Sequence, residues 1–348
     1  MKNKFLNFIA IAVAAFALGV FARDVSAGEF YQGKNIRFIV GFAAGGGYDA
    51  YARMVARYIS RYIPGHPSTV VENMDGAGSV IAANYMYNKA EKNGLTVGVW
   101  NSQNIFNQMM GDPSVRFDGR KFDWIGSPST DSVACAIMSF AGPKTFAEIA
   151  QSKKPLRMGA TRAGNTTQLP AMLNRWAGAK FDVIPGYTGT SKIRLAMRSH
   201  EVDGACWTWD SMRSTARSML DAKGADKMIP FIINGKWEDP EVKDIAQFRD
   251  VIKDKANLNA FNTWNAANEF ARPFSLPPGS PPEALAVLRK AFQATIEDKD
   301  YVADANKSKL PVDYISGEKV DQYVGQIYSI SPEVKKRLEF LVKKARTS

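Results

Sequence analysis

The chain has 348 residues, a formal net charge of +11, 45 Lys and Arg, 34 Asp and Glu, and two His. This length suggests two domains of ordinary size, and the positive charge suggests an anionic partner. The basic residues are scattered along the chain, which argues against a nucleic-acid surface or a membrane surface. Neither His66 nor His200 has metal-ligand neighbours at a recognisable spacing, so we expect no zinc or iron site and no metal cofactor.

The N-terminus resembles a secretory signal peptide. Two lysines precede an apolar stretch over residues 5–21, and the small residues Val25 and Ala27 form a cleavage site before Gly28. We therefore expect residues 1–27 to be removed during export to the periplasm. The alternative is an uncleaved membrane anchor, for which the apolar stretch is short.

The first half of the mature chain alternates strand-like and helix-like segments. Expected strands at 36–42, 68–73 and 95–101 are separated by expected helices at 50–63 and 76–90. The helix at 50–63 has an apolar face and a face that carries three arginines. This alternation indicates an α/β fold with a doubly wound sheet.

The pattern starts again in the second half. We expect strands at 155–161, 181–187, 202–209 and 228–235, and helices at 145–151, 166–176, 191–200, 283–298, 318–329 and 332–345. The sequence therefore predicts two doubly wound units.

The two cysteines lie in apolar, strand-like runs, "SVACAIM" and "VDGACWTW". Cys135 and Cys206 could therefore lie on neighbouring strands and pair in an oxidising compartment. Sequence does not give the distance between their Cα atoms, so buried free thiols are the preferred interpretation.

One loop type occurs four times, as "FAAGGGYD", "NMDGAGS", "TRAGNTTQ" and "GYTGTSK". In each case an apolar run ends, a loop of small residues follows, and a helix begins. Each loop leaves backbone N–H groups and the positive end of a helix at the carboxyl end of a strand. Four such loops in two units suggest a crevice for an anion, although helix capping alone also explains each loop.

A dinucleotide site is the main alternative. Gly45-x-Gly47-x-x-Ala50 fits the dinucleotide fingerprint, and Glu72 follows near the position of a ribose-binding acid. The expected export of the chain and the absence of a convincing acid–base pair argue against an oxidoreductase. A basic adhesion module that binds nucleic acid is a third interpretation, and it predicts salt-dependent binding.

The chain resembles a known family, the periplasmic solute receptors of tripartite tricarboxylate transporters, also called Bug or TctC receptors. The resemblance rests on "IRFIVGFAAGGGYDAYARMVA", "VVENMDGAGSVIAANYM", "LRMGATRAGNTTQLPAML" and "VIPGYTGTSKIRLAMRSHEVDGACW", in this order. The chain departs from the family at Ala44, where a proline is usual, at Tyr48, where a threonine is usual, and at residues 185–189, where the family's lysine is missing.

The resemblance implies a two-lobed Venus-flytrap fold, with a doubly wound sheet in each lobe and two crossing strands as the hinge. Lobe I would comprise 28–126 and 240–348, and lobe II would comprise 127–239. The ligand would be a small carboxylate, such as a di- or tricarboxylate or an aromatic acid. It implies a monomer without catalytic residues or cofactor that delivers this ligand to the membrane permease of the transporter.

Carried onto this sequence, the resemblance and the loop pattern together give a set of candidate ligand contacts. These are Phe42, Ala43, Ala44, Gly45, Gly46, Gly47, Gly78, Ser79, Asn101, Ser102, Gly164, Asn165, Thr166, Thr167, Tyr187, Thr188, Gly189, Thr190, Ser191, Trp209 and Asp210.

Several nearby residues have more than one interpretation. Asp49 is expected to cap a helix and not to contact the ligand. Trp207 and Trp209 lie in one expected strand, and we expect one of them to face the core and the other the cleft. Lys192 and Arg162 are charged candidates for pairing with the ligand, or they are simply solvated.

Overall fold

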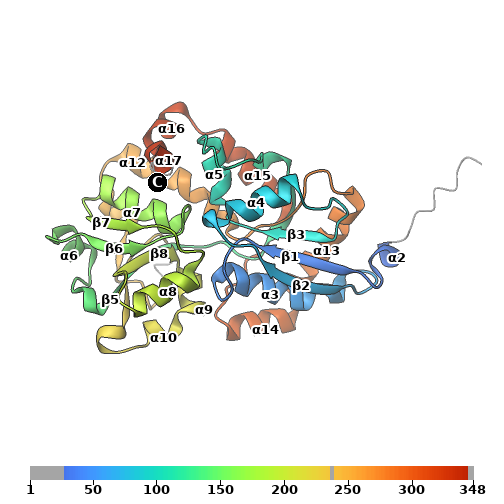
Figure 1. The fold of residues 1–348 in the computed structure, drawn as a ribbon, viewed down its shortest axis with the longest axis horizontal. Helices are drawn as coiled ribbons and strands as arrows, with labels where there is room; N and C mark the ends of the chain where they lie inside the picture. The colour runs from blue at the N-terminus through green and yellow to red at the C-terminus, as the bar shows by residue number, and fades with distance from the viewer. Residues whose placement is uncertain (1–26, 236–238, 344–348) are drawn as a thin grey trace, which may run out of the picture.

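The computed structural model describes residues 27–235 and 239–343, and it contains two six-stranded sheets that lie side by side (Figure 1). The predicted two-lobed α/β fold is thereby confirmed. The predicted signal peptide falls almost wholly on residues outside the described ranges. Within those ranges, no helix is both long and apolar enough to cross a membrane.

The first sheet has the strand order β12-β4-β11-β3-β1-β2. Its strands are β1 (Asn35–Val40), β2 (Ser68–Asn73), β3 (Thr96–Val99), β4 (Asp123–Ser127), β11 (Phe274–Leu276) and β12 (Ile315–Ser316). Strands β2, β1 and β3 are parallel, whereas β11 is antiparallel to both of its neighbours. β11 arrives from the other half of the molecule, so it is a crossing strand of the predicted kind.

The second sheet repeats this plan in the order β10-β9-β5-β8-β6-β7. Its strands are β5 (Val133–Met138), β6 (Leu156–Gly159), β7 (Phe181–Ile184), β8 (Gly204–Thr208), β9 (Met228–Ile233) and β10 (Ala246–Gln247). Here the strand that arrives from the other lobe is β5, which is antiparallel to β8 and β9. Four strands end at the edge that faces the other lobe, because residues just after them line the cavity described below: β1 and β3 in the first sheet, and β6 and β8 in the second.

Helices cover both sheets. The α-helices are α2 (Ala27–Tyr31), α3 (Gly47–Ile59), α4 (Val80–Asn88), α5 (Gln103–Met109), α6 (Phe146–Gln151), α7 (Asn165–Trp176), α8 (Thr190–Arg198), α9 (Trp209–Thr215), α10 (Arg217–Leu220), α11 (Phe248–Val251), α12 (Lys255–Asn265), α13 (Pro282–Glu297), α14 (Lys299–Lys307), α15 (Gly317–Tyr328), α16 (Pro332–Leu338) and α17 (Phe340–Lys343). The 3-10 helices are η1 (Ser60–Tyr62), η2 (Ala77–Ser79), η3 (Gly119–Lys121), η4 (Ser139–Ala141), η5 (Gly224–Asp226) and η6 (Ala266–Phe270).

Helix α3 begins at Gly47, earlier than the expected start at Ala50. Its buried face includes Met54, Val55 and Tyr58, as the sequence pattern predicted. The third glycine of the loop is therefore itself the first helical residue, which brings the helix N-terminus to the edge of the sheet.

Cys135 and Cys206 form a disulfide, so the preferred interpretation of free thiols was wrong. The two residues are directly opposite in the antiparallel pair of β5 and β8, with Cα atoms 3.9 Å apart. The sequence placed both residues on strands but did not give the register that aligns them. Both are fully buried in the second lobe.

The lobes exchange segments near the C-terminus. Strand β10 lies in the second sheet, although residues 240–348 were expected in lobe I. Helix α17 packs against α7 of the second lobe, and α16 packs against α12 (Figure 1). A division by sheet membership would therefore place the return to lobe I after residue 247.

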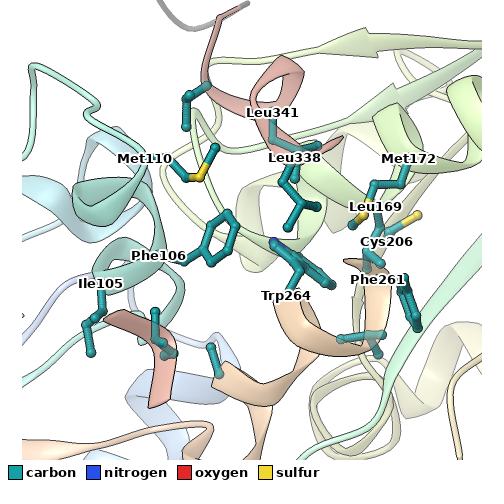
Figure 2. Close-up of a cluster of buried hydrophobic side chains, with 14 of the residues drawn as sticks. Ile105, Phe106, Met110, Leu169, Met172, Cys206, Phe261, Trp264, Leu338 and Leu341 are labelled. Carbon is teal, nitrogen blue, oxygen red and sulfur yellow. The ribbon is translucent and has the colours of Figure 1, made fainter. Parts of the chain in front are cut away.

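A large apolar cluster joins the lobes on one side. Figure 2 shows Phe106 and Met110 of the α5 segment facing Trp264 of α12 and Leu338 of α16. Leu169 and Met172 of α7 belong to the same cluster, so the two lobes share one apolar core at this place.

Candidate ligand-binding site

Three helices begin where the two lobes face each other. The N-cap residues are Gly46 for α3, Gly164 for α7 and Gly189 for α8, and none of these helices has a side-chain hydrogen bond at its cap. Because glycine has no side chain, the N–H groups of the first turn have no capping group from the N-cap residue. Each helix also presents roughly half a positive charge at this end.

These helix ends surround a cavity of about 60 Å³ between the lobes. A water molecule needs about 10–15 Å³ of such space, so the cavity has room for about four to six water-sized groups. That size suits a small molecule. The cavity is lined by Phe42, Gly46, Gly47, Tyr48, Asn101, Asp131, Thr161, Ala163, Asn165, Thr166, Thr190, Trp207, Thr208, Ser211, Ala271 and Arg272.

Glycines bring the lobes into close contact around this cavity. A Cβ atom on Gly47 would lie 2.6 Å from Oγ of Ser211 in the second lobe. A Cβ on Gly78 would lie 2.9 Å from the backbone nitrogen of Ala163. Since real Cβ atoms do not approach other atoms so closely, any larger residue would push the lobes apart.

Hydrogen bonds also cross between the lobes beside the cavity. The Ala43 N–H donates to the Thr188 carbonyl at 3.3 Å. Nη2 of Arg194 on α8 donates to the Gly45 carbonyl at 2.9 Å, while its Nη1 donates to Thr215 of its own lobe. Burial, together with nearby Arg198, lowers the pKa of Arg194 to about 10, so the side chain stays charged at neutral pH.

Asp49 has a structural role, but it holds the loop before α3 and does not cap the helix as expected. Its carboxylate accepts a hydrogen bond from the Gly45 N–H at 2.9 Å and pairs with Arg53. Burial alone would raise the pKa of Asp49, but hydrogen bonds from Arg53, Gly45 and Asn73 lower it below its ordinary value. The carboxylate therefore fixes the shape of the glycine loop.

A buried ion pair lies at the hinge side of the cavity. The side chains of Arg272 and Asp131 are 2% and 0% exposed, and they contact each other directly. Nη1 of Arg272 also donates to Ser129 at 3.0 Å, and its Nη2 donates to Thr208 at 2.9 Å. Burial by itself lowers the pKa of Arg272, but the Asp131 carboxylate and other neighbours raise it above its ordinary value.

The structure brings together seven of the predicted contact residues at the cavity. These are Phe42, Gly46, Gly47, Asn101, Asn165, Thr166 and Thr190. They come from the glycine loop, from the residues after β3, and from the starts of α7 and α8. The loop-to-helix pattern therefore predicted residues that line this cavity from both lobes, and their contact with a ligand stays a prediction.

The other predicted contacts do not line the cavity. They are Ala43, Ala44, Gly45, Gly78, Ser79, Ser102, Gly164, Thr167, Tyr187, Thr188, Gly189, Ser191, Trp209 and Asp210. Lys192 and Arg162, the charged candidates, do not line it either.

Several of these residues instead shape the loops. Ser79 Oγ accepts from the Asn101 N–H at 2.9 Å, and Ser102 Oγ donates to the Ala267 carbonyl. Thr167 Oγ1 donates to the Thr161 carbonyl. Tyr187 points its hydroxyl at Glu201, 2.5 Å away, and therefore does not cover the ligand space.

Of the two tryptophans, Trp207 lines the cavity and Trp209 does not. Strand β8 ends at Thr208, so Trp209 is the first residue of α9. Its Nε1 donates to Asp239 at 2.8 Å inside the second lobe. Residues two apart on a strand share a face, so strand alternation does not explain the difference; Trp209 lies elsewhere because the strand has already ended.

The sequence interpretation missed Tyr48, Asp131, Thr161, Ala163, Thr208, Ser211, Ala271 and Arg272 as lining residues. Asp131 and Arg272 lie on the two segments that cross between the lobes. Crossing segments pass beside the cleft in such a fold, so polar residues in them could have been suspected. Ser211 follows directly on the predicted pair Trp209 and Asp210.

No family model matches this sequence, and no curated protein sequence matches it. Several solved structures, however, are similar to this chain. The periplasmic binding protein BugD aligns with 91% of this chain and 99% of its own at 19% identity, with a TM-score of 0.68. MatC from Rhodopseudomonas palustris with bound malate aligns with 89% of this chain and 99% of its own at 20% identity, with a TM-score of 0.67.

A third structure, an R. palustris protein with adipate, aligns with 88% of this chain and 97% of its own at 16% identity, with a TM-score of 0.68. All three likenesses extend over almost the whole of the solved chains and both lobes of this one. The chain therefore has the two-lobed fold of the periplasmic binding proteins to which its sequence motifs had pointed.

Proposed function

We propose that this protein is a solute receptor of the Bug or TctC type, which binds a small carboxylate between its lobes and is not an enzyme. The observation that carries this proposal is the meeting of three helix N-termini, those of α3, α7 and α8, at one cavity. Backbone N–H groups and positive helix ends are a favourable environment for a carboxylate.

The solved structures support the same ligand class. MatC contains malate and the other R. palustris protein contains adipate, both of which are small dicarboxylic acids. A cavity with room for about four to six water-sized groups suits acids of this size. We infer that the ligand is enclosed when the lobes close, because residues from both lobes line the space.

The location and the partners follow from this role. We propose that the protein acts in the periplasm after cleavage before Gly28, works as a monomer, and presents its ligand to the permease subunits of a tripartite transporter. Among the described residues, no group of three or more His, Cys, Asp or Glu could hold a metal ion. The proposed binding mode needs neither a metal nor a cofactor.

The dinucleotide alternative fits the geometry less well. Glu72 forms a two-point ion pair with Arg37, with N–O distances of 2.8 and 2.7 Å, instead of projecting toward the glycine loop. Pockets for larger ligands usually measure about 300–1,000 Å³, far more than this cavity. The start of α3 therefore has space for a small anion and not for a dinucleotide.

A thermal-shift screen of mono-, di- and tricarboxylic acids, followed by titration calorimetry, tests the proposal. We expect at least one acid with about three to six carbons to raise the melting temperature, and its methyl ester to have no effect. NAD and NADP are the comparison ligands for the alternative. A response to a dinucleotide, with none to any carboxylate, would overturn the proposal.

A further inference from the structure

The buried ion pair places one carboxylate and one guanidinium in the cavity lining. Asp131 and Arg272 both line the cavity, and the side chain of Asp131 is fully buried. Arg272 has further partners in Ser129 and Thr208. Among the described residues, neither carboxylate oxygen of Asp131 accepts a hydrogen bond that meets ordinary geometry, and the charge of Arg272 is its one close ionic partner.

Donor groups of other residues that line the cavity are also unsatisfied. Nε of Arg272, Nε1 of Trp207 and Oγ of Ser211 are buried and have no hydrogen-bond partner in the described part of the chain. Trp207 and Ser211 are each 3% exposed, and both line the cavity. Buried polar groups almost always have partners, so this concentration at one cavity indicates that a ligand supplies them.

The unsatisfied groups are of two kinds, and their residues line the same cavity. Arg272, Trp207 and Ser211 offer N–H and O–H donors, which suit a ligand carboxylate. Asp131 is a carboxylate and therefore only accepts hydrogen bonds. A ligand that carries only carboxylates would place a second negative charge near Asp131 and supply no hydrogen-bond donor to its oxygens, whose one close ionic partner among the described residues is Arg272.

We propose, resting on the carboxylate receptor function above, that the ligand is a small α-amino acid whose ammonium group binds Asp131. An ammonium group has three donors and a positive charge, so it can satisfy both oxygens of Asp131, whereas a hydroxyl group has one donor and no charge. Its neighbouring carboxylate then lies against Trp207, Ser211 and the helix N-termini. The adjacent opposite charges of Asp131 and Arg272 match the adjacent opposite charges of an α-amino acid.

The test uses matched acids that differ in one substituent. The first set is propionate, L-lactate and L-alanine, and the second is succinate, L-malate and L-aspartate. Titration calorimetry on the wild-type protein measures the affinity for each. We expect the amino member of at least one set to bind about tenfold or more tightly than its hydroxy and unsubstituted members.

Two variants assign this preference to a residue. Asp131→Asn keeps the shape but removes the charge, and we expect it to abolish the preference for the amino member. Trp207→Phe keeps an aromatic ring but removes one donor, and we expect it to weaken all members while retaining the preference. The preference is a ratio measured within one variant, so a general loss of stability does not change it.

The outcomes separate this inference from the proposed function. Equal or tighter binding of succinate, malate, propionate or lactate overturns the inference and leaves the carboxylate receptor standing. The same holds if only acids without an α-amino group bind, or if Asp131→Asn retains the preference. If no carboxylic acid binds at all, the proposed function is overturned.

Discussion

The two lobes meet in two regions of opposite character. Around the cavity the contacts are polar and depend on the backbone, as in the Ala43 N–H to Thr188 carbonyl bond and the Arg194 to Gly45 carbonyl bond. On the other side, Phe106 and Met110 pack with Trp264, Leu169 and their neighbours in one apolar cluster (Figure 2).

This difference suggests how the molecule opens. Polar contacts exchange readily for water, because each hydrogen bond contributes only about 0.5–1.5 kcal/mol net. Apolar contacts cost about 25 cal/mol for each Å² exposed. We therefore expect the lobes to rotate about the apolar cluster and to separate at the cavity. The buried bond from Gln168 to Asn107, 2.8 Å long, ties α7 to α5 beside this cluster and supports the same axis.

The largest predicted effect comes from breaking the apolar region. Phe106 is 1% exposed, and Phe106→Ala should lower the free energy of unfolding by about 3–5 kcal/mol, because it leaves a cavity in the shared core. Urea denaturation followed by circular dichroism measures this. Leu195→Ala is the control, since Leu195 is 58% exposed and its loss should change the stability by less than about 0.5 kcal/mol. Equal effects of the two variants would contradict the importance of the cluster.

The disulfide tests whether the second lobe moves as a rigid body. Replacing Cys135 and Cys206 together by alanine should lower the free energy of unfolding by about 2–4 kcal/mol. The disulfide joins residues that are 71 positions apart, so it restricts the unfolded chain. Ligand affinity should stay within about twofold of the wild type, since neither cysteine lines the cavity. A large loss of affinity in calorimetry would show that the inside of the second lobe takes part in closure.

In the polar contact region around the cavity, a substitution that adds a single methyl group should reduce ligand affinity. Gly47→Ala adds one methyl group, which would lie 2.6 Å from Ser211 Oγ in the second lobe. Within the first lobe Gly47 is the first residue of helix α3, a position that alanine can occupy. We expect ligand affinity to fall at least tenfold, about 1.4 kcal/mol, with the lobes held apart. Small-angle scattering should show less compaction when the carboxylate identified in the screen is added.

The matched control for this variant is Gly325→Ala. Gly325 lies in α15, and an added Cβ there meets no atom within 4 Å. This variant should bind and compact like the wild type. If Gly47→Ala behaves in the same way, the closed contact at the start of α3 is not needed for binding.

The sequence predicted the outline of this site better than its chemistry. The end of an apolar strand and the start of a helix are local features, so the loops at Gly46 and Thr190 were found without a structure. Asp131 and Arg272 come from separate crossing segments and become neighbours only when the chain returns between the lobes. No local pattern marks such a pair.

The disulfide and the orientation of the tryptophans were also not predicted, because both depend on where strands end and how they align. The sequence placed Cys135 and Cys206 on strands, but the pairing depends on the register between β5 and β8. Trp207 faces the cavity and Trp209 does not, because β8 ends at Thr208 and the alternation of a strand stops there. The residue at which β8 ends therefore decides which of the two tryptophans lines the cavity.

The smallest predicted effect concerns the bond between Arg194 and the Gly45 carbonyl, which crosses the cavity region at 2.9 Å. Arg194→Gln should remove this bond and leave the glycine loop intact, because Asp49 still accepts from the Gly45 N–H. We expect the affinity to fall about three- to tenfold, since this bond is exposed to solvent, which screens its charge, and a typical hydrogen bond contributes about 0.5–1.5 kcal/mol net.

Arg198→Gln is the matched control for this last variant. Arg198 lies one turn further along α8, and its Nη2 donates to Ser218 Oγ in the same lobe, at 2.7 Å. The two substitutions remove the same charge from the same helix, but only one removes a contact between the lobes. Titration calorimetry at two salt concentrations separates the effects: a general electrostatic attraction for the anion would weaken with salt and affect both variants alike. A loss confined to Arg194→Gln at both concentrations would show that the bond itself holds the closed form, and equal losses would contradict this role.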